Sequence, residues 1–190
     1  MIIGITGGTG CGKTTLLKEI ENRGGLVLDC DAVYHELLTR DDALLSAINH
    51  RFPGTVVDKK LERKKLGAVV FADPGALEDL NAITHGAIKA EIVQRLAQKP
   101  ALAAIDAIAL FEGGLSDLCD TTVAVCAPEA IRVERLMQRD GITREYAENR
   151  IRAQKPESWF REMCDYTLYN NSTRDEFAEK CREFLDEILE

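Results

Sequence analysis

Hydrophobic positions along the chain follow two patterns. Apolar runs at residues 2–6, 26–28, 101–106, 121–126 and 165–169 have the length of short buried strands. Between and after these runs, apolar residues recur every three or four positions, which predicts helices. Strands that alternate with helices favour a parallel sheet covered on both faces. We therefore predict an α/β fold of three layers with a five-stranded parallel sheet.

The helical pattern also suggests how the chain is divided. Residues 41–100 contain no clear strand but carry helical spacing at 58–70, 74–83 and 87–96. This favours a helical insertion between the second and third strands. Charged helical segments follow the fourth strand and predict a helical lid at about residues 139–164. The core would then comprise residues 1–40, 101–138 and 165–190, and its last helix begins at the capping box of Thr173 and Glu176.

Composition narrows the function classes. The 24 basic and 32 acidic residues give a net charge of −8, so no broad positive field is present to attract nucleic acid or an anionic membrane. No run approaches the roughly 20 apolar residues that cross a bilayer, and the N-terminus does not resemble a signal peptide. The six cysteines contain no C-x-x-C pair. We expect reduced thiols and a cytoplasmic monomer or small homo-oligomer.

A phosphate-binding motif lies between the first strand and the first helix. The pattern G-x-x-x-x-G-K-[ST] is met by Gly7, Gly12, Lys13 and Thr14. Such loops turn backbone N–H groups inward, and the following helix directs its N-terminal dipole at the bound phosphates. Lys13 can reach the β- and γ-phosphates of ATP, and the Thr14 hydroxyl can ligate Mg²⁺. The residues predicted to bind the nucleotide are Gly8, Thr9, Gly10, Cys11, Gly12, Lys13, Thr14 and Thr15.

Cys11 lies inside this loop and admits two interpretations. A thiol near a helix N-terminus and the cation of Lys13 can have a lowered pKa, which would make it sensitive to oxidation. Alternatively, Cys11 is a small residue that fits the loop.

Two aspartates follow predicted strands, at the edge of a parallel sheet where ligands bind. Asp31 could accept the proton of an attacking hydroxyl, and His35 shares its helix face. The alternatives are a helix cap for Asp31 and an ordinary half-exposed histidine for His35. Asp106 could orient Mg²⁺ or its water ligands, or cap the end of its strand. Phe111 and Glu112 follow and are predicted to line a substrate cleft.

Arg132, Arg135 and Arg139 recur at spacings of three and four residues, so they share one helix face. On so acidic a chain this cluster suggests phosphate contacts from a lid. Arg139 is the strongest candidate for a catalytic role, beside Lys13 and Asp31.

The residues together resemble the dephospho-CoA kinase family over nearly the whole chain. After the loop, the most specific match is Arg139-Asp140-Gly141-Ile142-Thr143 with Arg150-Ile151 and Gln154. Other similar segments are Asp29-Cys30-Asp31, Leu61-Glu62-Arg63, Leu80-Asn81-Ala82-Ile83-Thr84-His85, Leu110-Phe111-Glu112 and Asn170-Asn171.

The resemblance implies a P-loop kinase that uses ATP and Mg²⁺ to phosphorylate the 3′-hydroxyl of dephospho-CoA. It implies that Asp31 is the base, that Asn171 lies near the adenine, and that Thr14 and Asp106 bind the metal. It further implies that Asp31, His35, Arg63, His85, Phe111 and Glu112 bind the acceptor, with the insertion as the acceptor-binding part. Two alternatives stay open at this point: a P-loop kinase for a nucleoside, nucleotide or sugar acid, and a nucleotide-binding module without catalysis.

Overall fold

The computed structural model describes residues 1–190 and divides into two compact units. We call the first the sheet unit, and it comprises Met1–Leu28, Pro100–Leu110 and Ser116–Glu190. We call the second the helical unit, and it comprises Asp29–Lys99 and Phe111–Leu115. No helix in the chain combines the length and the apolar character that crossing a membrane requires.

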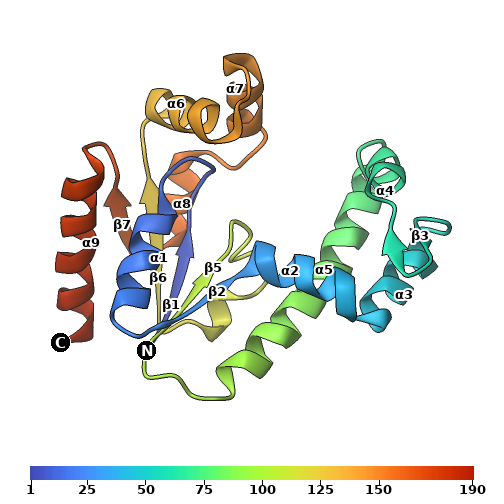
Figure 1. The fold of residues 1–190 in the computed structure, drawn as a ribbon, viewed down its shortest axis with the longest axis horizontal. Helices are drawn as coiled ribbons and strands as arrows, with labels where there is room; N and C mark the ends of the chain where they lie inside the picture. The colour runs from blue at the N-terminus through green and yellow to red at the C-terminus, as the bar shows by residue number, and fades with distance from the viewer. The chain divides into compact units, whose positions relative to one another are not determined.

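The sheet unit is built on a five-stranded parallel sheet, as predicted (Figure 1). Its strands lie in the order β2-β5-β1-β6-β7. In the register of the central strands, Ile5 pairs with Asp106 on one side and with Val123 on the other. The strands are β1 (Ile2–Thr6), β2 (Leu26–Asp29), β5 (Ala103–Asp106), β6 (Thr121–Cys126) and β7 (Tyr166–Tyr169).

One face of this sheet is covered by α1 (Lys13–Asn22) and α9 (Arg174–Leu189). Alternate residues of a strand point to opposite faces, and the fully buried Ile3 and Ile5 enter the core on this side. There they pack in one cluster with Leu16 of α1 and Phe177 of α9. The capping box predicted at Thr173 is present at the start of α9.

The opposite face is covered by α8 (Glu157–Met163), because Ala124 and Cys126 of β6 pack against its Phe160. Helix α8 was not predicted from the sequence. The remaining helical elements of the sheet unit are η1 (Ser116–Leu118), α6 (Glu129–Asp140) and α7 (Arg144–Arg152). A separate cluster of Val133, Leu136, Ala147 and Ile151 joins α6 to α7.

The helical unit is organised around one long helix, α5 (Pro74–Leu96), which contacts three other helices (Figure 1). These are α2 (Cys30–Arg40), α3 (Asp42–Arg51) and α4 (Arg63–Val70). The two helices predicted at residues 74–83 and 87–96 are therefore one continuous helix of 23 residues. Gly86 lies inside it and does not end it, because a single glycine costs an interior helix only about 1 kcal/mol relative to alanine.

The helical unit also contains a small hairpin where the sequence indicated no clear strand. Strands β3 (Val56–Val57) and β4 (Lys60–Leu61) pair antiparallel. Asp58 and Lys59 connect them with φ of 48° and 59°, the left-handed conformation that tight hairpin turns require. Helical spacing over residues 58–70 concealed this turn, and the helix begins only at Arg63.

Candidate active site

The loop between β1 and α1 has a backbone that only glycine permits at several positions. Gly7, Gly10 and Gly12 have φ of 139°, 79° and 92°. A Cβ atom on Gly7 would lie 2.2 Å from the Val125 carbonyl oxygen. A Cβ atom on Gly12 would lie 2.2 Å from Asn170 Nδ2. The close packing around the loop therefore requires its glycines.

The N-terminus of α1 lacks a side-chain cap. Gly12 is the N-cap residue and makes no capping hydrogen bond. The first N–H groups of a helix have no partner within the helix, so an uncapped start leaves donors for an anion, and the helix dipole favours negative charge there. Thr14 is exposed in the first turn, and Thr15 follows half-buried. This is the geometry of a phosphate-binding helix terminus.

Lys13 and Asp106 meet beside the loop. Lys13 Nζ lies 3.7 Å from Asp106 Oδ1 and donates a hydrogen bond to the Gly7 carbonyl oxygen at 3.3 Å. Both side chains are largely buried, with exposed fractions of 18% and 16%. The pair arises because β5, which Asp106 ends, lies next to β1.

The donors at this site fit a magnesium ion. Mg²⁺ prefers oxygen ligands and usually binds through one or two protein groups, with water and substrate phosphates completing its shell. The Thr14 hydroxyl and the Asp106 carboxylate supply oxygen donors of this kind. No group of three or more His, Cys, Asp or Glu residues forms a metal cage in the chain. That Thr14 and Asp106 are ligands of Mg²⁺ stays a prediction.

The outer side of the loop is held by Arg132 of α6 and Gln154, two residues beyond α7. Arg132 Nε donates to the Thr9 carbonyl oxygen at 2.8 Å, and the Thr9 N–H donates to Gln154 Oε1 at 2.8 Å. The same Gln154 oxygen accepts a longer bond of 3.4 Å from Arg132 Nη2. Arg132 also lies against Gly8, where a Cβ atom would be 2.3 Å from Nη2.

A second set of contacts holds the middle of the loop. Arg135 Nη1 donates to the carbonyl oxygens of Gly10 and Cys11, each at 3.3 Å. Its Nη2 donates to Asn170 Oδ1 at 3.0 Å, and Asn170 Nδ2 donates to the Cys11 carbonyl oxygen at 2.9 Å. Asn170 is buried, whereas its neighbour Asn171, the residue expected near the adenine, is exposed. Of the similar segment Asn170-Asn171, only Asn171 was predicted as a site residue, although Asn170 directly follows the fifth strand.

Arg139 behaves differently from the two arginines that precede it on α6. Its Nε and Nη2 donate to the two carboxylate oxygens of Asp140 at 2.6 and 2.9 Å. Arg150 Nη1 donates to the same carboxylate at 2.6 Å. These two guanidinium groups hold the pKa of Asp140 well below its usual range, and Arg139 makes the larger contribution. Arg139 is 60% exposed at its side chain, so the structure pairs it with Asp140 rather than with the loop.

The lowered pKa considered for Cys11 is wrong. The side chain is 3% exposed, and burial raises the pKa of its thiol because the thiolate would lose hydration. The positive charges of Arg132 and Lys13 act in the opposite direction but with smaller effect. Cys11 is therefore a small buried residue that fills the loop.

In the helical unit, Asp29 rather than Asp31 caps α2. One carboxylate oxygen of Asp29 accepts from the N–H groups of Asp31 and Ala32 at 2.9 and 3.1 Å. The Asp31 side chain is exposed in the first turn and takes no part in capping. His35 Nδ1 donates to the Asp31 carbonyl oxygen at 2.6 Å, so the expected proximity of these two residues is present.

The other residues expected to bind an acceptor lie at separate places in this unit. Arg63 is exposed at the first position of α4, and His85 is half-buried on α5. Phe111 and Glu112 belong to the short segment Phe111–Leu115. Burial raises the pKa of the Tyr34 hydroxyl on α2, and the positive charge of Arg63 acts on it in the opposite direction.

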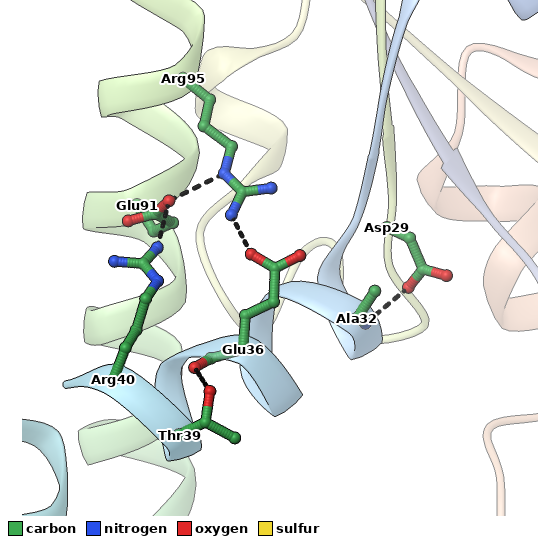
Figure 2. A network of polar contacts seen from close by, with 7 residues as sticks. All are labelled: Asp29, Ala32, Glu36, Thr39, Arg40, Glu91 and Arg95. Carbon is green, nitrogen blue, oxygen red and sulfur yellow. Dashed lines mark hydrogen bonds and ion pairs between the residues drawn. The ribbon is translucent and has the colours of Figure 1, made fainter.

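A network of ion pairs joins α2 to α5 (Figure 2). Glu91 accepts from Arg40 and Arg95 at 2.7 and 2.8 Å, and its side chain is only 11% exposed. Arg95 also pairs with Glu36. The two guanidinium groups lower the pKa of Glu91, and Arg40 makes the larger contribution. Because α2 carries the candidate base Asp31 in its first turn, these contacts help to fix the position of that helix.

These features define the class of the protein. A parallel sheet, a glycine loop followed by an uncapped helix, and a lysine beside a strand-terminal aspartate are the parts of a P-loop nucleotide-binding site.

Comparison with known proteins identifies the family. A sequence model described as dephospho-CoA kinase matches residues 1–176. The dephospho-CoA kinase of Lactobacillus acidophilus is 33% identical, and the match covers 100% of this chain and 98% of that protein. The chain therefore belongs to the dephospho-CoA kinase family.

Solved structures agree with this assignment. A crystal structure of a Thermus thermophilus protein is 32% identical with a TM-score of 0.82, and the match covers 98% of this chain and 97% of that one. The dephospho-CoA kinase of Campylobacter jejuni is 25% identical with a TM-score of 0.69, covering 98% of this chain and 96% of that one.

Proposed function

We propose that this protein transfers the γ-phosphoryl group of ATP to the 3′-hydroxyl of the ribose of dephospho-CoA, giving coenzyme A and ADP. The observation that supports it most is the glycine loop with Lys13 and Asp106 at its base, in a chain of the dephospho-CoA kinase family. The cytoplasmic location and the oligomeric state stay predictions from the sequence.

In the proposed mechanism the loop holds the phosphates through its backbone N–H groups and the N-terminus of α1. The Lys13 ammonium offsets charge that develops on the phosphoryl group as it moves. Bound Mg²⁺, held by Thr14 and Asp106, would supply further neutralisation of the phosphate oxygens.

Asp31 is the proposed base. Its carboxylate takes the proton of the 3′-hydroxyl, whose oxygen forms a bond to the γ-phosphorus while the bond from that phosphorus to the ADP oxygen breaks. Two observations support this role: Asp29 already caps α2, and the Asp31 side chain is exposed immediately after the carboxyl end of β2. Arg139 is proposed to join the transferred phosphoryl group from a lid, which requires it to leave Asp140.

The test is an assay of ADP release coupled to NADH oxidation, with dephospho-CoA as acceptor. Shikimate, gluconate and adenosine serve as comparison acceptors, since small-molecule P-loop kinases for such compounds were the alternative. We expect turnover only with dephospho-CoA, and a product that carries the new phosphate on the 3′-oxygen by ³¹P NMR. Faster turnover on any comparison acceptor would contradict the proposal.

A further inference from the structure

The main chain of Thr9 is held at both of its polar groups by side chains from outside the loop. Its carbonyl oxygen accepts from Arg132 Nε and its N–H donates to Gln154 Oε1, each at 2.8 Å. The bond from Arg132 Nη2 to Gln154, at 3.4 Å, closes the triangle. We call Arg132, Gln154 and the Thr9 peptide the loop clamp. The sequence pattern placed Arg132 in a cluster predicted to contact phosphates and Gln154 in a segment similar to the family, but it did not predict that either side chain holds the Thr9 peptide.

The burial of Arg132 indicates that its contacts with the loop stabilise the folded protein. The residue is 6% exposed, and its guanidinium donates hydrogen bonds to two neutral oxygen atoms. A buried guanidinium loses much of its hydration, so such a group is retained only where other contacts offset that loss. Here the offsetting contacts are a backbone carbonyl oxygen and the Gln154 amide oxygen. The charge therefore serves the conformation of the loop rather than a partner carboxylate.

Both side chains of the clamp come from a rigid support. The cluster of Val133, Leu136, Ala147 and Ile151 packs α6 against α7. Arg132 precedes Val133 on α6, and Gln154 lies three residues after Ile151. The Gln154 N–H also donates to the Ile151 carbonyl oxygen at 3.1 Å, which fixes the chain as it leaves α7. The positions of Arg132 and Gln154 relative to each other are thus fixed by the packing of α6 on α7 and do not depend on their contacts with the loop.

We propose that Arg132 and Gln154 are positioning residues that hold the Thr9 peptide and thereby keep the loop in its phosphate-binding conformation. They act through the backbone of Thr9 and contact neither substrate. A loop that is already ordered loses less conformational freedom when a polyphosphate binds, so the clamp favours nucleotide affinity. The inference rests on the nucleotide half of the proposed function and does not depend on the acceptor.

The experiment measures the Kd of ATP and of ADP by isothermal titration calorimetry on the full chain. The variants are Arg132→Met, Arg132→Lys, Gln154→Leu and the double variant Arg132→Met with Gln154→Leu. Each single variant should weaken both nucleotides by about tenfold, the effect of losing one or two hydrogen bonds. The double variant should weaken them by less than the product, because both side chains hold one peptide. The Kd of dephospho-CoA should stay unchanged.

Arg132→Lys separates position from charge. Lysine keeps the cation but cannot place a planar guanidinium between the Thr9 carbonyl and Gln154. Native nucleotide affinity in this variant would overturn the proposal, because it would show that charge alone is sufficient. So would native affinity in Gln154→Leu, or effects that simply multiply in the double variant. If Arg132→Met does not fold, Arg132→Lys and Gln154→Leu still decide.

Matched controls and a second readout separate positioning from general damage. Arg182→Met on α9 and Gln138→Leu on the exposed side of α6 make the same chemical changes away from the loop and should leave both Kd values unchanged. In the ADP-release assay the clamp variants should raise KM for ATP more than they lower kcat. An equal loss of affinity for ATP and for dephospho-CoA would mean general unfolding and would overturn the proposal. A chain that fails to phosphorylate dephospho-CoA but loses ATP affinity in these variants would refute the proposed function and leave the clamp standing.

Discussion

The sheet unit and the helical unit fix their candidate functional groups by different means. In the sheet unit, side chains from α6, the end of α7 and the end of β7 hydrogen-bond to the backbone of the loop. In the helical unit, the candidate groups Asp31, His35, Arg63 and His85 lie on helices, and ion pairs such as Glu91 with Arg40 connect α2 to α5 (Figure 2). One unit fixes a backbone conformation, and the other fixes helix positions.

The difference is consistent with our proposal that the sheet unit binds the phosphates and the helical unit binds the acceptor. Backbone N–H groups recognise phosphates only if several peptides point to one place, so the loop itself must be restrained. An acceptor recognised by side chains needs only helices at the right positions, since side chains can adopt their rotamers on binding. We therefore expect loop substitutions to alter nucleotide affinity and helical-unit substitutions to alter acceptor use or stability.

The largest effect is expected from Lys13→Ala. It removes the cation that lies beside Asp106 and that we propose contacts the phosphates, so kcat should fall by about 100- to 1000-fold, as when one electrostatic group of a transition state is lost. ATP affinity should fall as well. The thermal unfolding midpoint of the unliganded protein serves as a control and should change little. Turnover within about tenfold of native would contradict the assignment of this loop as the phosphoryl-transfer site.

Asp31→Asn should affect catalysis without affecting nucleotide binding. We expect kcat to drop by at least about 100-fold, the lower range for loss of a general base, with the Kd of ATP almost unchanged. Asp42→Asn, which alters the exposed partner of Lys59 in the same unit, is the control and should keep native kcat. Near-native turnover in Asp31→Asn would refute the base assignment.

Glu91→Gln tests the ion-pair network. Removing the charge should lower the free energy of unfolding by about 1 kcal/mol, between the values for exposed and buried pairs. Asp79→Asn breaks the exposed pair with Arg51 in the same unit and should cost less than about 0.5 kcal/mol. Urea unfolding followed by circular dichroism measures both, and an equal cost would contradict the special role of Glu91.

The loss of stability in Glu91→Gln should depend on pH. The pKa of Glu91 is lowered in the folded state, so its stabilisation is complete above the unfolded value of about 4.3. It is lost as the pH falls through the lowered folded pKa. The difference in stability between the native protein and Glu91→Gln should therefore be full at pH 7 and shrink below about pH 4.

The smallest effect is expected at Cys11. Because burial raises the pKa of its thiol, the thiolate fraction at pH 7.5 is low and alkylation by iodoacetamide should be slower than for an exposed cysteine by about tenfold or more. Mass spectrometry of the modified peptide measures the rate. Peroxide should inactivate the native protein and Cys11→Ser at equal rates. Rapid labelling of Cys11 in the folded chain would show that the loop opens far more often than the clamp allows.

Much of the sheet unit could be predicted because its signals are local. The strand at residues 121–126 and the helix at 13–22 follow from short apolar runs and their spacing, and the loop follows from its glycines. The contacts of Arg132, Gln154 and Asn170 could not be predicted in the same way. They join residues more than 100 positions apart, and no periodicity indicates which polar side chain meets which carbonyl.

The helical unit was harder to predict for a different reason. Helical spacing identified its class of structure but not its element boundaries. It divided α5 into two helices and passed over the Asp58-Lys59 turn, since a turn of two residues leaves apolar spacing almost intact. At Asp29 and Asp31, sequence could not say which aspartate caps α2, because both lie at positions where a cap is favourable.

The uncapped start of α1 makes the folding equilibrium sensitive to nucleotide supply. Gly12 provides no capping side chain, so phosphates bound there as we propose would supply partners for the first N–H groups of the helix that covers the central strands. A ligand that binds only the folded state stabilises it by RT ln(1 + [L]/Kd), about 2.7 kcal/mol when its concentration is 100 times Kd. A fall in the total concentration of ATP and ADP toward Kd would reduce this stabilisation and increase the population of the unfolded chain.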